Sequence, residues 1–554
     1  MSDRRRVAVV TGGGGGIGAA IAEELGRHGW FVATADPLVT LDGTERLPEP
    51  QETTAGRIVA AGGAARASSA SVTDAPALHR LFEDLVQEHG ALDAVVNVAG
   101  ITRKSGFAEG TEEDWLALLT VHLGGYLNVL GAALPLMAAA GHGRILGVTS
   151  GSGWRAADAG GYSCAKRVVA SLTWQLGALA PAGVTVNAIS PIAATRMVAA
   201  AAERARQEGR SGAGGGLSLF RSMPGPEALG PLGAHLVSDE LGWCRGQVLF
   251  AGGSETAVVA PPRLLEVLRT ADVASLPHVL TTVIPRAFAT AEANQASGGG
   301  GNPRFAALFE EAASVEPARG DVRSCAIVTD RPPLASAIEG ALQARSVACR
   351  RLEPTEGFAD AAKSLRGAVE VAGPVDAIVV VRSGGNPADG RGTGWERVLA
   401  EHDGIVAQIQ ADAGWARAAA DYAVETNRPI RLVTLVDATT AGGRSRAQAA
   451  AQLARVSLGT TDGRVSAFTA GIEALQDPAA PLVGELVAFL LCDPGAGALV
   501  GAELVVGGGW LGLRSHPHPA GTLSYGGAGL PEWFDTVLGE LVGSADHPGR
   551  RQTR

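Results

Sequence analysis

A run of five glycines, Gly12 to Gly16, follows the short apolar segment Val7–Val10 and leads directly into a helical pattern. This order is typical of parallel α/β sheets that bind a phosphate at the turn between strand and helix. Glycine permits positive φ and a close approach of backbone to ligand, and the helix directs its first amides, such as that of Ile17, at the anion. The alternative is a plain strand–helix turn. We expect a pyrophosphate loop with G-x-x-x-G-x-G spacing at Gly12, Gly16 and Gly18.

Apolar strand-like segments alternate with helical periods over residues 7–254 and again over residues 322–512. Such alternation predicts mostly parallel sheets covered by helices on both faces. The strands predicted in the first stretch are Val7–Val10, Trp30–Ala35, Ala91–Val96, Arg144–Val148, Val184–Ile189 and Gly246–Phe250. Those predicted in the second are Cys325–Val328, Val375–Val381, Arg431–Val436, Arg464–Thr469 and Ala502–Val506.

The two stretches also resemble each other in sequence, which indicates an internal repeat. Leu92–Val96 matches Val375–Val379, and Leu236–Asp239 matches Leu490–Asp493. We therefore predict an α/β chain of two tandem Rossmann-type, doubly wound parallel-sheet domains, of which the second is degenerate. The predicted parts are a catalytic domain over 1–260, a linker with short helices over 261–320, the degenerate domain over 321–512 and a C-terminal tail over 513–554. Within these parts, helices are expected at Leu264–Leu276 and near Glu532–Val542.

Charge and composition narrow the class of protein. The net charge of −10 at pH 7 makes nucleic acid an unlikely partner. The sequence contains no run of about 18 uncharged apolar residues, so we expect no membrane span. The apolar segment after the basic N-terminus is too short for a signal peptide. The five cysteines are scattered without metal-ligand spacing, so we expect no metal site and a reduced, cytoplasmic protein.

Residues that follow the next strands bear on the cofactor. Asp36 ends the second predicted strand, where its carboxylate can accept hydrogen bonds from both adenosine ribose hydroxyls. The same carboxylate would repel a 2′-phosphate, and no Arg or Lys lies beside the glycines or within five residues after Asp36, so NAD is favoured over NADP. Asn97, Ala99 and Gly100 follow another apolar strand, where small residues would let the adenosine half pack.

A candidate for proton transfer is the Y-x-x-x-K pair Tyr162 and Lys166. Positions i and i+4 share one face of a helix, so the ammonium can lie near the phenol. A nearby cation favours the phenolate and would lower the pKa of Tyr162, which would make it a general acid/base for hydride transfer. Ser150, after the strand Arg144–Val148, can orient a substrate carbonyl. Alone, the motif also fits an ordinary surface pair.

Taken in order, these motifs resemble the short-chain dehydrogenase/reductase family over residues 7–253. The matching motifs are T-G-x-x-x-G-x-G at Thr11–Gly18, N-x-A-G at Asn97–Gly100, Ser150, Y-x-x-x-K at Tyr162–Lys166, N-x-x-x-P at Asn187–Pro191 and Thr195. The resemblance implies an NAD-binding alcohol dehydrogenase or ketoreductase. In it, Thr11, Pro191 and Thr195 join the cofactor site, with Thr195 contacting the nicotinamide carboxamide.

Finer details resemble the hydroxyacyl-CoA dehydrogenase part of multifunctional enzyme type 2 and its bacterial relatives. Val121–Gly125 matches V-H-L-x-G, so His122 stands where most of the family has an Asn that supports a proton relay to the lysine. His122 can carry a proton itself, or it can be a helix histidine with a structural role. Two other positions depart from the family. Ser150 and Tyr162 are 12 positions apart instead of 13, and Ser71-Val72 replaces Asp-Val at the adenine contact.

The second repeat lacks this equipment. After Cys325–Val328 comes Thr329–Pro333, with no glycine loop and with prolines that remove amide donors. Asp437–Arg455 contains neither Tyr nor Lys. Family members pair through helices around the active site, so the second copy is expected to fill that role inside one chain, with further homodimerisation left open.

The resulting hypothesis is an NAD-dependent oxidoreductase that interconverts a secondary alcohol and a ketone on a small-molecule substrate, with Tyr162 as acid/base. The resemblance implies a 3-hydroxyacyl thioester or a hydroxysteroid-like alcohol. Two alternatives are a ketoreductase acting on sugars or polyketides and a non-catalytic cofactor-binding scaffold.

Overall fold

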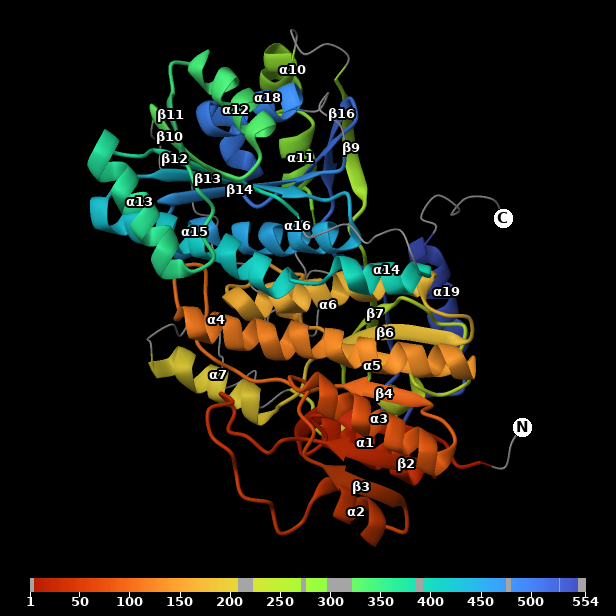
Figure 1. Ribbon diagram of the computed structural model, residues 1–554. Coiled ribbons are helices and arrows are strands. Elements are labelled where there is room, and N and C mark those ends of the chain that lie inside the picture. The colour runs from red at the N-terminus through yellow and green to blue at the C-terminus, as the bar shows by residue number, and fades with distance from the viewer. Residues whose placement is uncertain are drawn as a thin grey trace, which may run out of the picture.

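The computed structural model describes residues 4–207, 223–270, 276–295, 321–384, 392–474, 480–527 and 529–546. Two sheets form the frame, one built mainly from the N-terminal half (residues 4–260) and one from the C-terminal half (residues 321–514). Figure 1 shows the sheets one above the other, with layers of helices between them. Each sheet is mostly parallel, so the α/β fold with Rossmann-like sheets is confirmed.

The first sheet has nine strands in the order β17-β8-β7-β6-β5-β4-β1-β2-β3. Strands β1 to β7 run parallel, whereas β8 and β17 are antiparallel to their neighbours. The bounds are β1 Val7–Thr11, β2 Phe31–Ala35, β3 Ala64–Ser68, β4 Ala94–Asn97, β5 Gly143–Val148, β6 Val184–Pro191, β7 Val248–Gly252, β8 Glu255–Ala260 and β17 His518–Ser524. All members of β1, β4, β5, β7 and β8 are buried, as expected for strands covered on both faces.

Helices of the N-terminal half follow from local sequence signals, as α3 illustrates. Asp74 caps its start by accepting a hydrogen bond from the Ala77 amide, and Gly90 ends it in the left-handed region at φ 88°. Its buried residues recur at helical spacing, namely Leu78, Leu81, Phe82 and Leu85. The helices of this half are α1 Gly16–Arg27, α2 Thr54–Ala60, α3 Ala75–His89, α4 Glu112–Leu119, α5 Gly125–Ala140, α6 Gly160–Leu179, α7 Arg196–Gln207 and α9 Gly230–His235.

The second sheet has eight strands in the order β11-β10-β12-β13-β14-β15-β16-β9. This order matches that of the first sheet when the first sheet is read from its β3 end and β3 itself is left out. β11 then corresponds to β2, β10 to β1, and β9 to β17. The bounds are β10 Ser324–Thr329, β11 Ala348–Leu352, β12 Ala377–Arg382, β13 Ile430–Asp437, β14 Val465–Ile472, β15 Glu503–Gly507, β16 Trp510–Arg514 and β9 Leu264–Arg269. Its helices are α12 Pro332–Gln343, α13 Phe358–Ala372, α14 Gly394–Glu401, α15 Ile405–Thr426, α16 Ala441–Ala454, α17 Ser457–Thr460 and α18 Ala480–Cys492.

One edge strand of each sheet comes from the other part of the chain. β9 follows the first sheet in sequence but pairs with β16, and β17 follows the second sheet but pairs with β8. The next helices cross over in the same way, since α10 (Leu276–Val283) packs on α18 and α19 (Phe534–Asp546) packs on β8 and β17. The expected linker 261–320 and tail 513–554 thus each contribute a strand to the opposite sheet.

The helix expected over Leu264–Leu276 is wrong, because β9 occupies Leu264–Arg269. Its apolar side chains do not form a buried helical face: Leu264, Leu265 and Val267 are all exposed. Pairing with the free edge of β16 satisfies the backbone of this segment, so tertiary context overrides its helical propensity.

Helices α4, α5 and α6 face α14, α15 and α16 between the two sheets, as Figure 1 shows. One apolar core runs through this layer and joins residues such as Leu123 and Val168 with Trp415 and Ala419 of the C-terminal half. Polar pairs also cross it: Arg167 donates to Glu503 at 2.8 Å and Ser445 to Ser171 at 2.9 Å.

The stretch Glu112–Ala140, which contains α4 and α5, is apolar and long enough to cross a membrane by length and composition alone. Of its most apolar window, 56% is buried inside the protein. Its place in the shared core accounts for its hydropathy, as for the core helix of a large domain.

Candidate active site

The glycine loop has the geometry of an anion cradle. Gly12 has φ +64°, and a Cβ there would lie 2.8 Å from the amide nitrogen of Ala99. Gly16 has φ +56°, and a Cβ on Gly18 would lie 2.2 Å from the carbonyl oxygen of Gly12. No side chain caps α1, which starts at Gly16, so the amides of its first turn, including Ile17, remain for a phosphate. All three glycines are therefore required for conformation or space.

Asp36 lies over this loop at the end of β2. Its Oδ2 accepts a hydrogen bond from the Gly14 amide at 3.0 Å, and its Oδ1 accepts one from Leu38 at 2.9 Å. A Cβ on Gly14 would lie 2.6 Å from Oδ2, so a larger residue would displace the carboxylate. These bonds fix the carboxylate beside the loop, as a ribose-binding acid requires.

Thr11 and Asn97 join the ends of β1 and β4. The Thr11 hydroxyl donates to Oδ1 of Asn97 at 2.7 Å and accepts from the Ala99 amide at 3.4 Å. Both side chains are buried. These two motif residues therefore hold the backbone of the cradle in place. Gly100, at the end of the same motif, lies against the His122 ring.

Pro191 ends β6 and leads to Thr195, which approaches the glycine loop from the other side. The Thr195 methyl lies 3.9 Å from where a Cβ on Gly16 would be, and its hydroxyl accepts from the Val198 amide at 3.3 Å. Arg196 follows, and its Nη2 lies 3.3 Å from the Cβ position of Gly15. Cations were sought in the sequence beside the glycines and in the five residues after Asp36, so Arg196 was missed; a basic residue directly after Thr195 was the available signal.

Ser150, Tyr162, Lys166 and His122 meet at the carboxyl ends of the strands. Ser150 lies close enough to the Tyr162 hydroxyl to lower the pKa of the phenol. The Lys166 ammonium lies 5.6 Å from the centroid of the Tyr162 ring and donates to the carbonyl of Val148 at 2.6 Å. The His122 ring stands edge-on to the Tyr162 ring, with the two centroids 4.9 Å apart. The structure thus brings together all four predicted residues.

Burial sets the protonation of this cluster. It raises the pKa of Tyr162, and the hydrogen bond with Ser150 opposes part of that rise. It also lowers the pKa of Lys166 to about 7. The expectation that Lys166 lowers the pKa of Tyr162 is therefore wrong for the protein without ligands. The Lys166 ammonium lies over the face of the Tyr162 ring and donates to the Val148 carbonyl. Burial also disfavours the charged form of Lys166.

His122 lies in a π-helical turn, Thr120–Gly124, between α4 and α5. Its Nε2 bonds the carbonyl of Ile101 at 2.8 Å, and a Cβ on Gly100 would lie 2.5 Å from its Cε1. Burial, followed by the charge of Lys166, lowers its pKa to about 3. Its Nδ1 is buried without a hydrogen-bond partner in the described part of the chain. The same Nε2 lies 3.3 Å from the Ile101 amide nitrogen, so it can donate to the carbonyl or accept from the amide, and in the tautomer that donates through Nε2 the Nδ1 atom is an acceptor.

The family profile described as short chain dehydrogenase matches residues 6–206, the part of the chain that carries this cluster. Short-chain reductase protein NovJ of Streptomyces niveus is 38% identical over 200 residues, which cover 36% of this chain and 73% of NovJ. The chain belongs to the short-chain dehydrogenase family. Members of this family are oxidoreductases that act on CH–OH groups with a nicotinamide cofactor.

Two further relatives show the range of the family around this chain. Acetoacetyl-CoA reductase of Cupriavidus necator is 34% identical over 200 residues, which cover 35% of this chain and 78% of that enzyme. Peroxisomal hydratase-dehydrogenase-epimerase of Saccharomyces cerevisiae is 33% identical over 199 residues, which cover 36% of this chain and 22% of that protein.

We expect the loop after Ser150 to form the part of the site that contacts the substrate. This loop contains a short 3-10 turn, Gly151–Gly153, and the buried Trp154, whose indole donates to Ser190 at 2.9 Å. Asp158 accepts from the Phe107 amide at 2.8 Å and so ties the loop to the segment before α4. The irregular, Ala- and Gly-rich segment 194–226 is a second segment expected to determine substrate specificity, and it lies partly outside the described residues, since 208–222 are not described.

The C-terminal half has charged pairs where the N-terminal half has its cradle. Pro332 and Pro333 open α12 without amide donors. Asp330 accepts from the Ser383 amide at 2.7 Å, and Arg331 pairs with Asp437 at 3.2 Å. These contacts lie at the carboxyl ends of β10, β12 and β13, which in the first sheet correspond to the catalytic edge.

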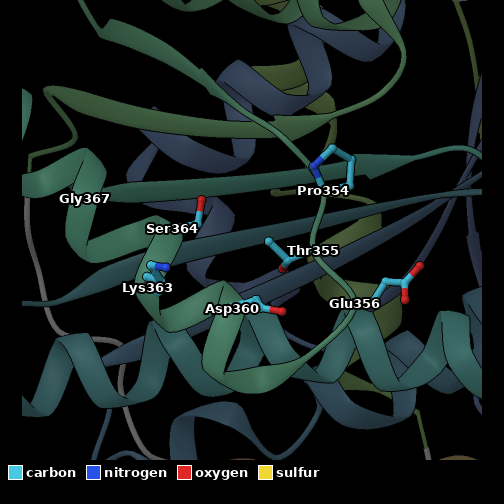
Figure 2. A pocket seen from close by; sticks show the side chains of 7 residues that line it. All are labelled: Pro354, Thr355, Glu356, Asp360, Lys363, Ser364 and Gly367. Atoms are coloured by element: carbon cyan, nitrogen blue, oxygen red, sulfur yellow. The ribbon is translucent and has the colours of Figure 1, made fainter.

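A shallow hollow of about 580 Å³ lies between the end of β11 and α13 in the C-terminal half, as Figure 2 shows. Glu356 and Asp360 line it beside Lys363. None of the residues of the glycine, serine or Y-x-x-x-K motifs lines it.

Proposed function

We propose that the N-terminal half is an NAD-dependent oxidoreductase that interconverts a secondary alcohol and a ketone. The observation that carries this proposal is the meeting of Ser150, Tyr162 and Lys166 beside the glycine cradle and Asp36. A buried lysine whose pKa is lowered to about 7 beside a tyrosine is typical of functional sites.

The residues present fit a dinucleotide. The amides after Gly12 and Gly16 would hold the pyrophosphate, with Arg196 close enough to add a positive charge. Asp36 would accept from the adenosine ribose hydroxyls, which favours NAD over NADP. When bound, the nicotinamide supplies the acceptor or donor of the hydride.

Within this proposal, Tyr162 gives or takes the hydroxyl proton and Ser150 holds the substrate oxygen through a hydrogen bond. Lys166 is held by the Val148 carbonyl within 5.6 Å of the Tyr162 ring centroid, where it stabilises the phenolate whenever it is charged. The free Nδ1 of His122 is an acceptor near this group, so His122 takes the place of the relay Asn as a neutral residue.

For the substrate class we propose a 3-hydroxyacyl thioester, with a hydroxysteroid-like alcohol as the second member of the same class of secondary alcohols. Support comes from the likeness to acetoacetyl-CoA reductase, whose name states a thioester substrate. A panel of hydroxyacyl-CoA compounds, hydroxysteroids, sugars and polyketide-type ketones, followed by NADH and NADPH absorbance, tests both substrate and cofactor. Turnover of sugars or polyketide-type ketones alone would contradict the thioester assignment, and NADPH-only turnover would contradict NAD.

We also propose that the C-terminal half is a degenerate copy of the same domain that serves as an intramolecular partner. The matching strand order, the crossed terminal strands and the packing of α14–α16 on α4–α6 support it. Its ion pairs and prolines in place of a cradle support the loss of cofactor binding.

A further inference from the structure

We infer that Gln452, in the C-terminal half, is a positioning residue for the catalytic Ser150. The inference rests on the proposed function of Ser150 and Tyr162, and it assigns the partner half a part in the reaction that goes beyond covering an apolar face.

The primary contact is between Gln452 and the loop after Ser150. Gln452 lies in α16 and is 2% exposed. Its Nε2 donates to the carbonyl of Ser152 at 3.0 Å and to that of Arg155 at 2.5 Å. Arg455, just after α16, donates to the carbonyl of Trp154 at 3.1 Å. Side chains from one short segment of the C-terminal half thus hold three carbonyls of the substrate loop.

A chain of hydrogen bonds leads from this contact to the reacting groups. The Ser152 amide donates to the Ser150 hydroxyl oxygen at 3.2 Å, and the carbonyl of the same residue is the one that Gln452 holds. Ser150 in turn lies close enough to Tyr162 to lower the pKa of its phenol. Ser152 therefore links the two contacts, because its amide holds the Ser150 hydroxyl oxygen and its carbonyl, in the next peptide group, is held by Gln452.

The backbone of the loop also supports its first turn, since the Gly153 amide donates to the Ser150 carbonyl and the Arg155 amide to the Gly151 carbonyl, both at 2.9 Å. The turn has only three residues, Gly151–Gly153, of which two are glycines, so the contacts from α16 add to a short and intrinsically adaptable turn. Loss of the Gln452 donors would leave part-buried carbonyls unsatisfied, which the loop would relieve by moving. A displacement of the order of 1 Å at such a group can cost about 100-fold in rate.

The test replaces Gln452 in the full chain by Met, which is similar in size but has no donor, and by Asn, which keeps the amide on a shorter stem. The matched control is Gln448→Met, one helical turn away, whose Oε1 is buried without a partner in the described part of the chain. We expect Gln452→Met to lower kcat about tenfold with the Kd for NAD changed less than about twofold, and Gln452→Asn to lie between it and wild type. The control should keep wild-type kcat.

An ultraviolet titration separates this inference from the proposed function. Tyr162 is one of four tyrosines, so the wild-type curve minus that of Tyr162→Phe reports its ionisation. Lys166 and His122 face it from α6 and the π-helical turn and are unchanged in the variants. We expect Gln452→Met to move this ionisation to higher pH, because the Ser150 bond is weakened.

The outcomes are distinct. Wild-type turnover with unchanged kcat and unchanged Tyr162 titration in both Gln452 variants would overturn the inference alone. Absent wild-type turnover would overturn the proposed function, and the titration would then decide the positioning role by itself. Thermal unfolding of each variant shows whether it is folded, and if Gln452→Met is not, Gln452→Asn carries the same test.

Discussion

At the scale of single residues, polar side chains of the site are fixed by partners that their own motifs do not contain. Asp36 is held by the Gly14 amide, and Lys166 by the Val148 carbonyl. Both partners are backbone groups, so the side chains keep their orientation without a bound ligand. Such pre-organisation spares the cost of ordering these groups when substrate binds.

The carboxylate of Asp36 should decide the choice of cofactor. Replacement of Asp36 by Ala removes both the ribose acceptor and the charge that repels a 2′-phosphate. We expect Kd for NAD to rise about tenfold and Kd for NADP to fall, as measured by tryptophan fluorescence. An unchanged ratio of the two Kd values would contradict the role given to Asp36.

The neutral state of His122 should appear in the acid stability of the protein. Its pKa is about 3 in the folded chain and near 6.5 when unfolded, so only the unfolded chain takes up a proton between these values. Stability is therefore lost as pH falls from about 6.5 to about 3, by on the order of 5 kcal/mol in total. Denaturant unfolding of His122→Asn should show a smaller loss over this window. Equal slopes for the two proteins would show that the imidazole is not held neutral.

At the scale of elements, the close packing of the turn between β1 and α1 requires glycines, because a side chain at these positions would collide with the backbone. A methyl group on Gly18 would lie 2.2 Å from the Gly12 carbonyl, so α1 must shift away from the cradle in Gly18→Ala. We expect a rise in Kd for NAD of more than about tenfold. Gly131→Ala in α5 is the control, because nothing lies within 4 Å of a Cβ there and alanine favours the helix. An undisturbed Kd in Gly18→Ala would contradict the fit of the cradle.

The sequence predicted the buried strands better than the edge strands. β1 and β4 are almost entirely apolar, as a core that covers both faces of a sheet requires. β3 and β9 are not, because they lie at sheet edges and form mainly through backbone pairing. Their existence depends on a neighbouring strand that no local pattern reveals, which is why a helix was expected at Leu264–Leu276.

The sequence predicted those residues of the site that belong to recognisable motifs. Ser150, Tyr162, Lys166 and His122 are recognisable by type and spacing, and the structure brings them together. Gln452 was missed because its contact depends on packing between the halves. The expected direction of the Tyr162 pKa was wrong because burial, which spacing does not report, raises this pKa by more than Ser150 lowers it.

At the scale of the whole molecule, the two halves are joined by the crossed strands and by a shared core. Residues 1–260 alone would lack β17 and α19, which cover β8 and bury Phe534 and Leu538 in the first half. We expect this fragment to be insoluble or to self-associate, and co-expression with residues 261–554 to give a soluble complex of the two pieces. Size-exclusion chromatography with light scattering distinguishes these results. A stable monomer of 1–260 would contradict the partner role of the C-terminal half.

The most direct test of the central claim is the turnover of a 3-hydroxyacyl-CoA by wild type and by Tyr162→Phe, followed by NADH absorbance, with NAD affinity measured on both. Wild type should reduce NAD, and the variant should lose at least about 100-fold in kcat while binding NAD as before, because only the proton-transfer group is removed. Turnover by Tyr162→Phe at the wild-type rate would contradict the assignment of Tyr162 as the acid/base of this protein.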